Sequence, residues 1–537
     1  MAQSFTKPSW LHQAAVWIFH AAHQIINGVQ KHQVLYLAFA SAAYFAGTYW
    51  IVSVTPFHGD EFFTLYLSQL PTVKQIWSAL ASGLEALPPT IHLTTRVVEH
   101  WLGSGLFVSR LVSIVGFWVM LLSVYGFVAR RRGAVYAAVA SLFPMFTMAY
   151  SESCQLRPYG LVLAGCGMSL LFWQRATEGG RRIGALVGLS LSLALAVASH
   201  YYSVLLLAPF AAGELVRMRL RGRPDWPLWI ALAAALMPLV LFIPLILSST
   251  SQALLWASPF TFFHVLVIYR TDIHPALLTS LILMVIVAVT RWLGTAAGTQ
   301  PDPKRPAIPA HEIAAVVVLA LLPFVLALSA ALVTKAFFWH HAISFVAGLA
   351  ILFGFAASEA TSDNPVLAAT TFLAMIVLIA GAAYKKAEGA SGDTWNTLRA
   401  VRSPLFSLDE QLPIGIANTG LFLALQHYAP RPVSARLQYV TGTNPAHKAD
   451  DKDVSLLSRW TRFSVISYDS FLQVYPCFLI YERNDERDAY PVMNKLLADH
   501  KRVLVRGRDE FGELFLVNSA AVVHREEGSA PGPCEAH

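Results

Sequence analysis

Two adjacent carboxylates, Asp60 and Glu61, stand just beyond the first long apolar run of the chain. That run, residues 34–54, carries no charge and is long enough to cross a bilayer as a helix, which Pro56 and Gly59 would end. An acidic pair at a membrane face is costly to bury and therefore indicates a functional role. A carboxylate here could act as a general base that takes a proton from a hydroxyl group. The alternative is a structural role, because Asp is also favoured near helix starts.

Further polar and aromatic residues fall near the ends of apolar runs on the same predicted side of the membrane. A base surrounded by cations suits group transfer from a lipid phosphate, because the departing phosphate needs positive charge and Arg offers forked donors. Each residue could instead be an interface anchor or a packing residue. The candidate substrate-binding residues are His58, His92, Arg96, Arg157, Tyr159, His200, Lys335 and His340.

The histidines among these candidates raise the question of a metal site. Zinc takes His and carboxylate ligands, and magnesium takes carboxylate and phosphate oxygens. No His-x-x-x-His or Asp-x-Asp spacing occurs near the candidate residues, so a metal site would have to be assembled from separate segments. We expect no metal ligands and no obligatory cofactor, with a divalent metal ion held by separate segments as the alternative.

The composition is that of a polytopic membrane protein. Of 537 residues, 55% are hydrophobic and only 13% are charged, with a mean hydropathy of +0.52. The formal net charge of +7 could suggest nucleic acid, but the basic residues stand in short clusters between apolar runs and no nucleic-acid-binding motif accompanies them. We expect membrane lipids as partners and no nucleic acid.

Ten apolar runs follow the first and predict about eleven membrane spans in a helical bundle by the twenty-residue rule. They are residues 107–129, 134–150, 158–174, 183–199, 202–216, 228–248, 276–293, 312–334, 342–358 and 364–384.

Basic clusters occupy every second connection between these runs, which places those connections in the cytoplasm and the alternate ones outside. The outer connections include 55–106, which holds the acidic pair, and everything after about residue 385. Segment 55–106 is partly apolar and should form surface helices separated by Pro88-Pro89. The basic clusters are Arg130–Arg132, Arg175 with Arg181-Arg182, Arg217 to Arg223, and Arg291 with Lys304-Arg305.

The composition changes at about residue 385, where charged residues become frequent. We therefore expect two domains: a transmembrane domain, 1–384, and a small α/β domain, 385–537, on the outer face. Residues 492–497 have helical spacing, and the tail after about residue 526 should be disordered. Short β-type runs cover 437–440, 478–481, 502–505 and 513–517, and the last two would form a hairpin across Gly507–Gly512.

Four short motifs follow one another in a characteristic order. They are His58-Gly59-Asp60-Glu61, Pro88-Pro89-Thr90-Ile91-His92, Phe107-Val108-Ser109-Arg110-Leu111 and Arg157-Pro158-Tyr159-Gly160-Leu161. In this order and spacing the chain resembles the GT-C superfamily of multispanning glycosyltransferases. The resemblance is strongest to protein O-mannosyltransferases and to the bacterial transferase that adds aminoarabinose to lipid A. It covers roughly the first half of the chain, and the rest resembles the family by topology.

The resemblance implies a glycosyltransferase of the bacterial inner membrane with its active site on the periplasmic face. The donor would be a sugar on a polyprenyl monophosphate, and the acceptor a hydroxyl group of a glycan, lipid or protein. Asp60 would be the base in an inverting displacement with Glu61 in support, and Arg157 would bind the lipid phosphate. Family members often carry an Arg-Tyr pair at the outer start of a late span, where this chain has Phe338-Trp339-His340-His341.

Two other classes of protein remain open from the sequence. A transporter or lipid flippase would have the same kind of topology, and its charged residues would mark a substrate path. Against it, the charges gather on one face rather than near the midplane, and no inverted repeat is evident. A membrane scaffold that recruits partners through its C-terminal domain is the third class.

Overall fold

The computed structural model describes residues 10–253, 262–296, 307–334, 337–361, 364–409, 411–443, 448–483 and 491–519. Lys335 and the tail after residue 526 lie outside these ranges. The chain divides into two compact units, and each unit is discontinuous in sequence. The first unit contains Met1–Ile51, Leu87–Ile243 and Ala257–Lys386, and the second contains Val52–Ala86, Pro244–Trp256 and Ala387–His537.

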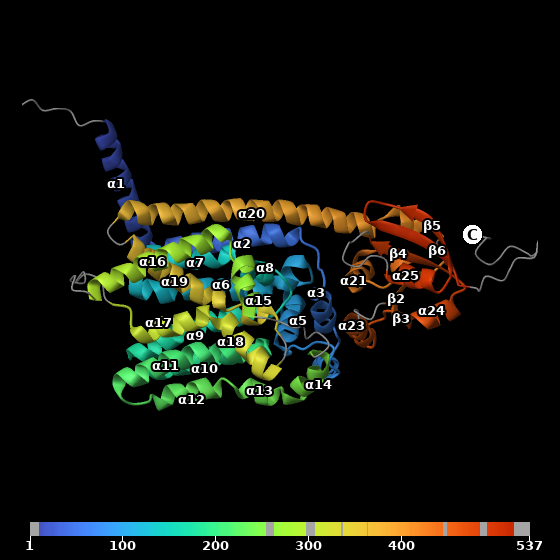
Figure 1. Cartoon of the computed structure of the whole chain (residues 1–537), viewed down its shortest axis with the longest axis horizontal. Helices are drawn as coiled ribbons and strands as arrows, with labels where there is room; N and C mark the ends of the chain where they lie inside the picture. The colour runs from blue at the N-terminus through green and yellow to red at the C-terminus, as the bar shows by residue number, and fades with distance from the viewer. Residues whose placement is uncertain are drawn as a thin grey trace, which may run out of the picture. The chain divides into compact units, whose positions relative to one another are not determined.

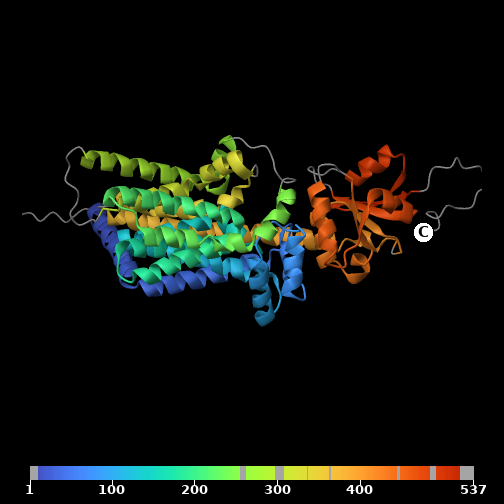
Figure 2. The same ribbon diagram turned by 90° about the horizontal axis from the view of Figure 1, so that it is seen from below.

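The first unit is a bundle whose long helices, apart from α1, lie roughly parallel to one another (Figures 1 and 2). Every apolar run that the sequence predicted as a span coincides with helix. The helices of this unit are α1 (Trp10–Lys31), α2 (Gln33–Ser53), α5 (Thr90–Leu102), α6 (Leu106–Arg132), α7 (Ala134–Leu142), α8 (Met148–Ser153), α9 (Tyr159–Glu178), α10 (Arg182–Ser199), α11 (Leu207–Arg221), α12 (Trp226–Ala234), α13 (Met237–Leu241), α15 (Phe262–Asp272), α16 (Pro275–Ala296), α17 (Ala310–Ala320), α18 (Leu322–Ser329), α19 (Phe345–Ala360) and α20 (Pro365–Val401), with short turns η1 (Phe143–Phe146), η2 (Tyr201–Leu206), η4 (Ala330–Thr334) and η5 (Trp339–Ala342).

Four helices within the described ranges are long and apolar enough to cross a membrane, and two bent pairs raise this number to six. The bends are 61° before Ile243 and 58° before Leu322. Pro244 and Pro323 stand at the second positions of the helices that follow these bends, where a missing N–H is tolerated but the preceding helix cannot continue. The other predicted spans form helices that are shorter or less apolar than the twenty-residue rule assumes. The protein is a multi-pass membrane protein built largely of helices.

Glycines allow three central helices of the bundle to pack closely. An added Cβ at Gly160 of α9 would lie 2.0 Å from the carbonyl oxygen of Ser113 on α6, and one at Gly116 would lie 2.3 Å from that of Gly160. A Cβ at Gly165 would likewise meet the Ser192 carbonyl oxygen of α10 at 2.6 Å. Small residues let helix backbones approach in this way. The start of α9, which carries a candidate motif, is therefore fixed directly against α6.

Replacing Gly160 by Ala should lower the thermal stability of the purified protein, because a methyl group cannot fit beside the Ser113 carbonyl without moving α6 from α9. Overpacking of this kind costs roughly 1–3 kcal/mol. Gly184→Ala on α10 is the matched control, because the added Cβ there meets no atom within 4 Å. Thermal unfolding in detergent would compare the two variants, and equal melting temperatures would contradict this account.

The second unit contains a six-stranded mixed sheet in the order β3-β2-β1-β4-β6-β5. The first four strands in this order pair in parallel, while β6 is antiparallel to both β4 and β5. Figure 1 shows the helices α21 (Thr419–Tyr428), α23 (Lys448–Ser458), α24 (Tyr468–Val474) and α25 (Pro491–Ala498) around it. The strands are β1 (Ile414–Ile416), β2 (Leu437–Thr441), β3 (Val465–Ser467), β4 (Cys477–Arg483), β5 (Arg502–Arg508) and β6 (Gly512–Asn518).

The four predicted strands, the hairpin and the predicted helix are all confirmed in this α/β fold. Strands β1 and β3 were not predicted, because three residues are too few to show an alternating pattern. The second unit also includes α3 (Glu61–Ser68) and α4 (Val73–Ala81), from the segment that follows the first span, together with most of α14 (Ile243–Ala253).

Helix α20 is continuous over 37 residues, and the division between the two units falls within it, after Lys386. Its first half lies beside α2 in the bundle, where the rings of Phe372 and Tyr36 are 5.9 Å apart (Figure 1). The change of composition near residue 385 therefore occurs inside a helix and not in a loop.

Candidate active site

The acidic pair of the second unit lies on a tight turn at the start of α3. Gly59 adopts a left-handed conformation with φ +51°, which a side chain would strain. The side chain of Glu61 is buried, and its carboxylate accepts a hydrogen bond of 3.2 Å from the backbone N–H of His58. His58 Nδ1 also lies 3.1 Å from the same oxygen. Glu61 and His58 therefore hold the turn together.

Asp60 occupies the N-cap position of α3, yet its side chain makes no capping hydrogen bond to the first turn of the helix. The residue is exposed, in contrast to Glu61, which is 1% exposed. The capping role that the sequence left open for this pair is thus not performed by the Asp60 carboxylate. An exposed carboxylate on a rigid turn is well placed to accept a proton from a bound molecule.

A second group of candidate residues surrounds the start of α9 in the first unit. The hydroxyl of Ser113 donates to the carbonyl of Arg157 at 2.6 Å and accepts from the N–H of Gly160 at 3.3 Å. Arg157 is 8% exposed. The Arg-Pro-Tyr-Gly motif is therefore held on both sides of Pro158 by one side chain of α6, which the closeness of Gly160 makes possible.

Rings from three separate segments meet beside this motif. The ring centroid of Tyr159 lies 5.2 Å from that of His340 and 6.0 Å from that of His200. His341 packs against His200 at 4.8 Å and stacks on Tyr202 at 4.1 Å. We call Arg157, Tyr159, His200, His340 and His341 the Arg-His cluster.

The imidazoles of the Arg-His cluster are neutral at physiological pH. Burial, followed by the nearby His340 and Arg157, lowers the pKa of His200 to about 3. Burial and Arg157 lower the pKa of His340 to about 4. The Tyr202 N–H donates to Nδ1 of His200 at 3.3 Å, which also requires that nitrogen to be unprotonated. The positive charge of the cluster thus comes from Arg157, while the histidines offer neutral donors and acceptors.

These lowered pKa values predict that acid destabilises the fold. The unfolded state takes up protons as the pH falls below about 6.5, whereas native His200 stays neutral until about pH 3. Stability should therefore fall as the pH drops from 6.5 to 4.5, by up to about 2–3 kcal/mol from this residue. Melting temperatures of wild type and His200→Asn at the two pH values would measure it, with the exposed His274→Asn as control. An identical acid dependence in wild type and His200→Asn would refute this account.

The remaining candidates are placed as follows. His92 and Arg96 lie on α5 of the first unit, where His92 is fully buried and Arg96 is partly buried. The first residue of α5, Thr90, donates its hydroxyl hydrogen bond to the Ala198 carbonyl near the end of α10, two residues before His200. Lys335 lies outside the described residues.

Two further polar residues of the first unit have unusual surroundings. Lys386 Nζ donates to the Ser151 hydroxyl at 2.7 Å and lies 4.7 Å from the centre of the Tyr150 ring. Asp272 is 5% exposed, and its pKa is raised to about 7, chiefly by burial. Lys386 was not recognised as a candidate from the sequence, because it stands where the composition changes to that of a soluble domain. No group of three or more His, Cys, Asp or Glu side chains within the described ranges is arranged to hold a metal ion.

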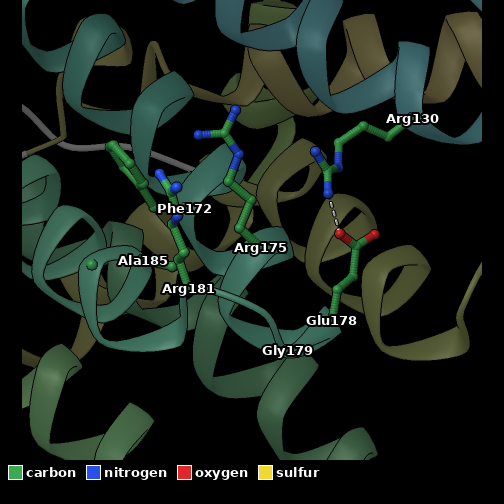
Figure 3. A pocket seen from close by; sticks show the side chains of 8 residues that line it. Arg130, Phe172, Arg175, Glu178, Gly179, Arg181 and Ala185 are labelled. Carbon is green, nitrogen blue, oxygen red and sulfur yellow. Dashed lines mark hydrogen bonds and ion pairs between the residues drawn. The ribbon is translucent and has the colours of Figure 1, made fainter.

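A cavity of about 420 Å³ lies at the end of α9 opposite to Arg157 (Figure 3). Its lining includes Phe172, Arg175, Arg181 and the ion pair between Arg130 and Glu178. A helix of 20 residues spans about 30 Å, so this cavity is a separate feature from the Arg-His cluster. It belongs to the arginine-rich connections that the sequence assigned to the cytoplasm.

Neighbouring arginines at this end of the bundle are bound to carboxylates. Arg131 pairs with the fully buried Glu312, and Arg217 lies 2.9 Å from Asp225. The basic clusters therefore fasten helices to one another in addition to carrying an orientation signal.

Comparison with known proteins gives a fold but no sequence family. No family model matches the chain, and no curated protein matches it. Among solved structures, ArnT from Cupriavidus metallidurans bound to undecaprenyl phosphate is similar with a TM-score of 0.51 and 14% identity, over 91% of this chain and 98% of ArnT. The same protein in the apo state gives 0.47 and 15%, over 91% and 98%.

A weaker match is the archaeal oligosaccharyltransferase AglB from Archaeoglobus fulgidus, in complex with an inhibitory peptide and a dolichol-phosphate. Its TM-score is 0.33 at 12% identity, over 76% of this chain and 64% of AglB. ArnT, a lipid A aminoarabinose transferase, and AglB are both GT-C glycosyltransferases. The fold that the order of the short motifs predicted is therefore confirmed by the ArnT match: the chain has the fold of the GT-C membrane glycosyltransferases.

Proposed function

We propose that this protein is a membrane glycosyltransferase that moves a sugar from a polyprenyl monophosphate to an acceptor hydroxyl group. The observation that carries the proposal is the turn at Asp60: an exposed carboxylate, not used as a helix cap, on a turn fixed by Glu61 and Gly59. The similarity in fold to ArnT, solved with undecaprenyl phosphate, supports this donor class.

In the proposed reaction, Asp60 takes the proton of the acceptor hydroxyl as its oxygen attacks the anomeric carbon of the sugar. The bond between that carbon and the phosphate oxygen breaks, and its electron pair leaves with the polyprenyl phosphate. This single displacement inverts the anomeric centre. General-base assistance of this kind contributes roughly 10²–10⁴-fold to the rate.

Arg157 is the proposed ligand of the lipid phosphate. It is the charged member of the Arg-His cluster, and its guanidinium can bind phosphate through two parallel hydrogen bonds. The neutral imidazoles of His200 and His340 can add hydrogen bonds without adding charge. We place this chemistry on the outer face of the membrane, which the alternating basic clusters in the sequence indicate. The family resemblance implies that this is the periplasmic face of a bacterial inner membrane.

The test is release of free polyprenyl phosphate. Purified protein would be incubated with a panel of polyprenyl-phosphate sugars, with and without a crude envelope fraction as acceptor, and the lipid products measured by mass spectrometry. Release with one donor, dependent on the acceptor fraction, is the expected result, and that donor would name the sugar. Flipping of a labelled lipid across vesicles without release would overturn the proposal in favour of a lipid flippase.

A further inference from the structure

The segment around the acidic turn contacts the C-terminal α/β fold of the same unit through aromatic residues. The backbone N–H of Phe57, three residues before Asp60, donates a hydrogen bond of 2.7 Å to the hydroxyl of Tyr428. Tyr428 is the last residue of α21, and these partners are 371 positions apart in the chain. Figures 1 and 2 both show α3 and α21 next to each other.

Ring contacts surround this hydrogen bond. Phe62 of α3 lies 6.3 Å from the Tyr428 ring and 5.6 Å from that of His427. The Tyr66 hydroxyl lies 3.3 Å from Nδ1 of His427. Phe57 and Phe62 are 5% and 0% exposed, so the Phe57 amide is in a region where an unsatisfied donor is costly.

A short chain of backbone hydrogen bonds leads from Phe57 to Asp60. The N–H of Glu61 donates to the His58 carbonyl at 3.1 Å, and that of Phe62 donates to the Gly59 carbonyl at 3.3 Å. The Asp60 carbonyl accepts from Thr64 in the first turn of α3 at 3.4 Å. The turn is thus held at its C-terminal end by α3 and at its N-terminal end by Tyr428.

We propose that Tyr428 is a positioning residue that fixes the Asp60 turn, so that the C-terminal α/β fold supports the reaction through this hydroxyl. This inference rests on the proposed function, in which Asp60 is the base. A shift of a reacting group by about 1 Å can cost a large part of the rate, so holding the turn matters for proton transfer. The role predicts an effect on kcat and none on donor affinity, because the Tyr428 hydroxyl is bonded to the Phe57 amide and would act on the turn.

Tyr428→Phe tests the proposal, because it removes the hydroxyl and keeps the ring. We expect kcat for polyprenyl phosphate release to fall about 10-fold, the scale of one hydrogen bond, with KM for the donor unchanged. In an Asp60→Asn background the same substitution should have no further effect on the residual rate, since Tyr428 acts through Asp60. A matched control is Tyr468→Phe on α24. It removes a hydroxyl group that donates a hydrogen bond of 2.8 Å to the Asp499 carboxylate.

Hydrogen–deuterium exchange of residues 52–68 gives a readout that needs no substrate. Exchange should be faster in Tyr428→Phe than in wild type, and unchanged in Tyr468→Phe. Equal exchange in all three proteins would show that the Tyr428 hydroxyl does not hold the turn. Faster exchange in Tyr428→Phe with unchanged kcat would refute its role as a positioning residue. If wild type released no polyprenyl phosphate, the proposed function would fail and the positioning role with it, while the exchange result would still decide whether Tyr428 holds the turn.

Discussion

Replacing Asp60 by Asn is expected to lower polyprenyl phosphate release by roughly 10²–10⁴-fold, because the amide keeps the shape of the side chain but cannot take the proton. Expression and melting temperature should be unchanged, since the side chain is exposed and makes no cap hydrogen bond. Mass spectrometry of the lipid products measures the rate. Asp469→Asn is the matched control, an exposed carboxylate in the first turn of α24 in the same unit.

Glu61→Gln distinguishes the role of Glu61 from that of Asp60. The Glu61 carboxylate holds His58, so its loss should reduce stability and weaken activity less than the loss of Asp60 does. If Glu61→Gln removed activity and Asp60→Asn retained it, the assignment of the base would be reversed. Full activity in both variants would exclude this acidic pair from the chemistry.

Replacing Arg157 by Ala is expected to reduce kcat/KM for the lipid donor by roughly 10²–10³-fold, the effect of removing one donor aimed at developing negative charge. Arg157→Lys should recover part of the loss, because the charge remains while the forked geometry is lost. Steady-state kinetics over a range of donor concentrations would measure both.

The control for Arg157 is Arg181→Ala, an exposed arginine that lines the cavity at the other end of the bundle. This variant loses the same charge and should keep the activity of wild type. Equal losses in the two variants would show that activity follows the overall positive charge and not a contact with the phosphate.

Much of the fold was predictable because it follows from local patterns. Each apolar run forms helix in the structure, and the four β-type runs of four or more residues form strands β2, β4, β5 and β6. Pro244 and Pro323 stand in the sequence, but the bends beside them were not predicted, because hydropathy averaged over a window does not register a single proline. The continuous course of α20 was hidden because hydropathy falls near residue 385, and because Gly389 and Gly392 after that point are residues that disfavour a helix.

The candidate site was predictable only in part, for a different reason. Arg157, Tyr159, His200 and His340 were selected separately as polar residues at span ends, and tertiary packing brings them into one cluster. The role of Ser113 depends on the close approach of α6 and α9, which requires glycines on both helices and leaves no pattern in a single segment. Tyr428 could not be found from sequence, because its partner is the backbone amide of Phe57 and any residue other than proline supplies one.

The discontinuity of the second unit has a consequence for how the protein is made. Phe57 leaves the ribosome 371 residues before Tyr428, which at about 5–20 residues per second corresponds to roughly 20–70 s of synthesis. During that interval α3 and α4 have no C-terminal fold to pack against, and the rings of Phe57 and Phe62 lack their contacts with His427 and Tyr428. For this period of synthesis the acidic turn is already translated, but the hydrogen bond from Phe57 to Tyr428 cannot yet form. A chain that ends prematurely before α21 would remain an inserted bundle without a finished turn.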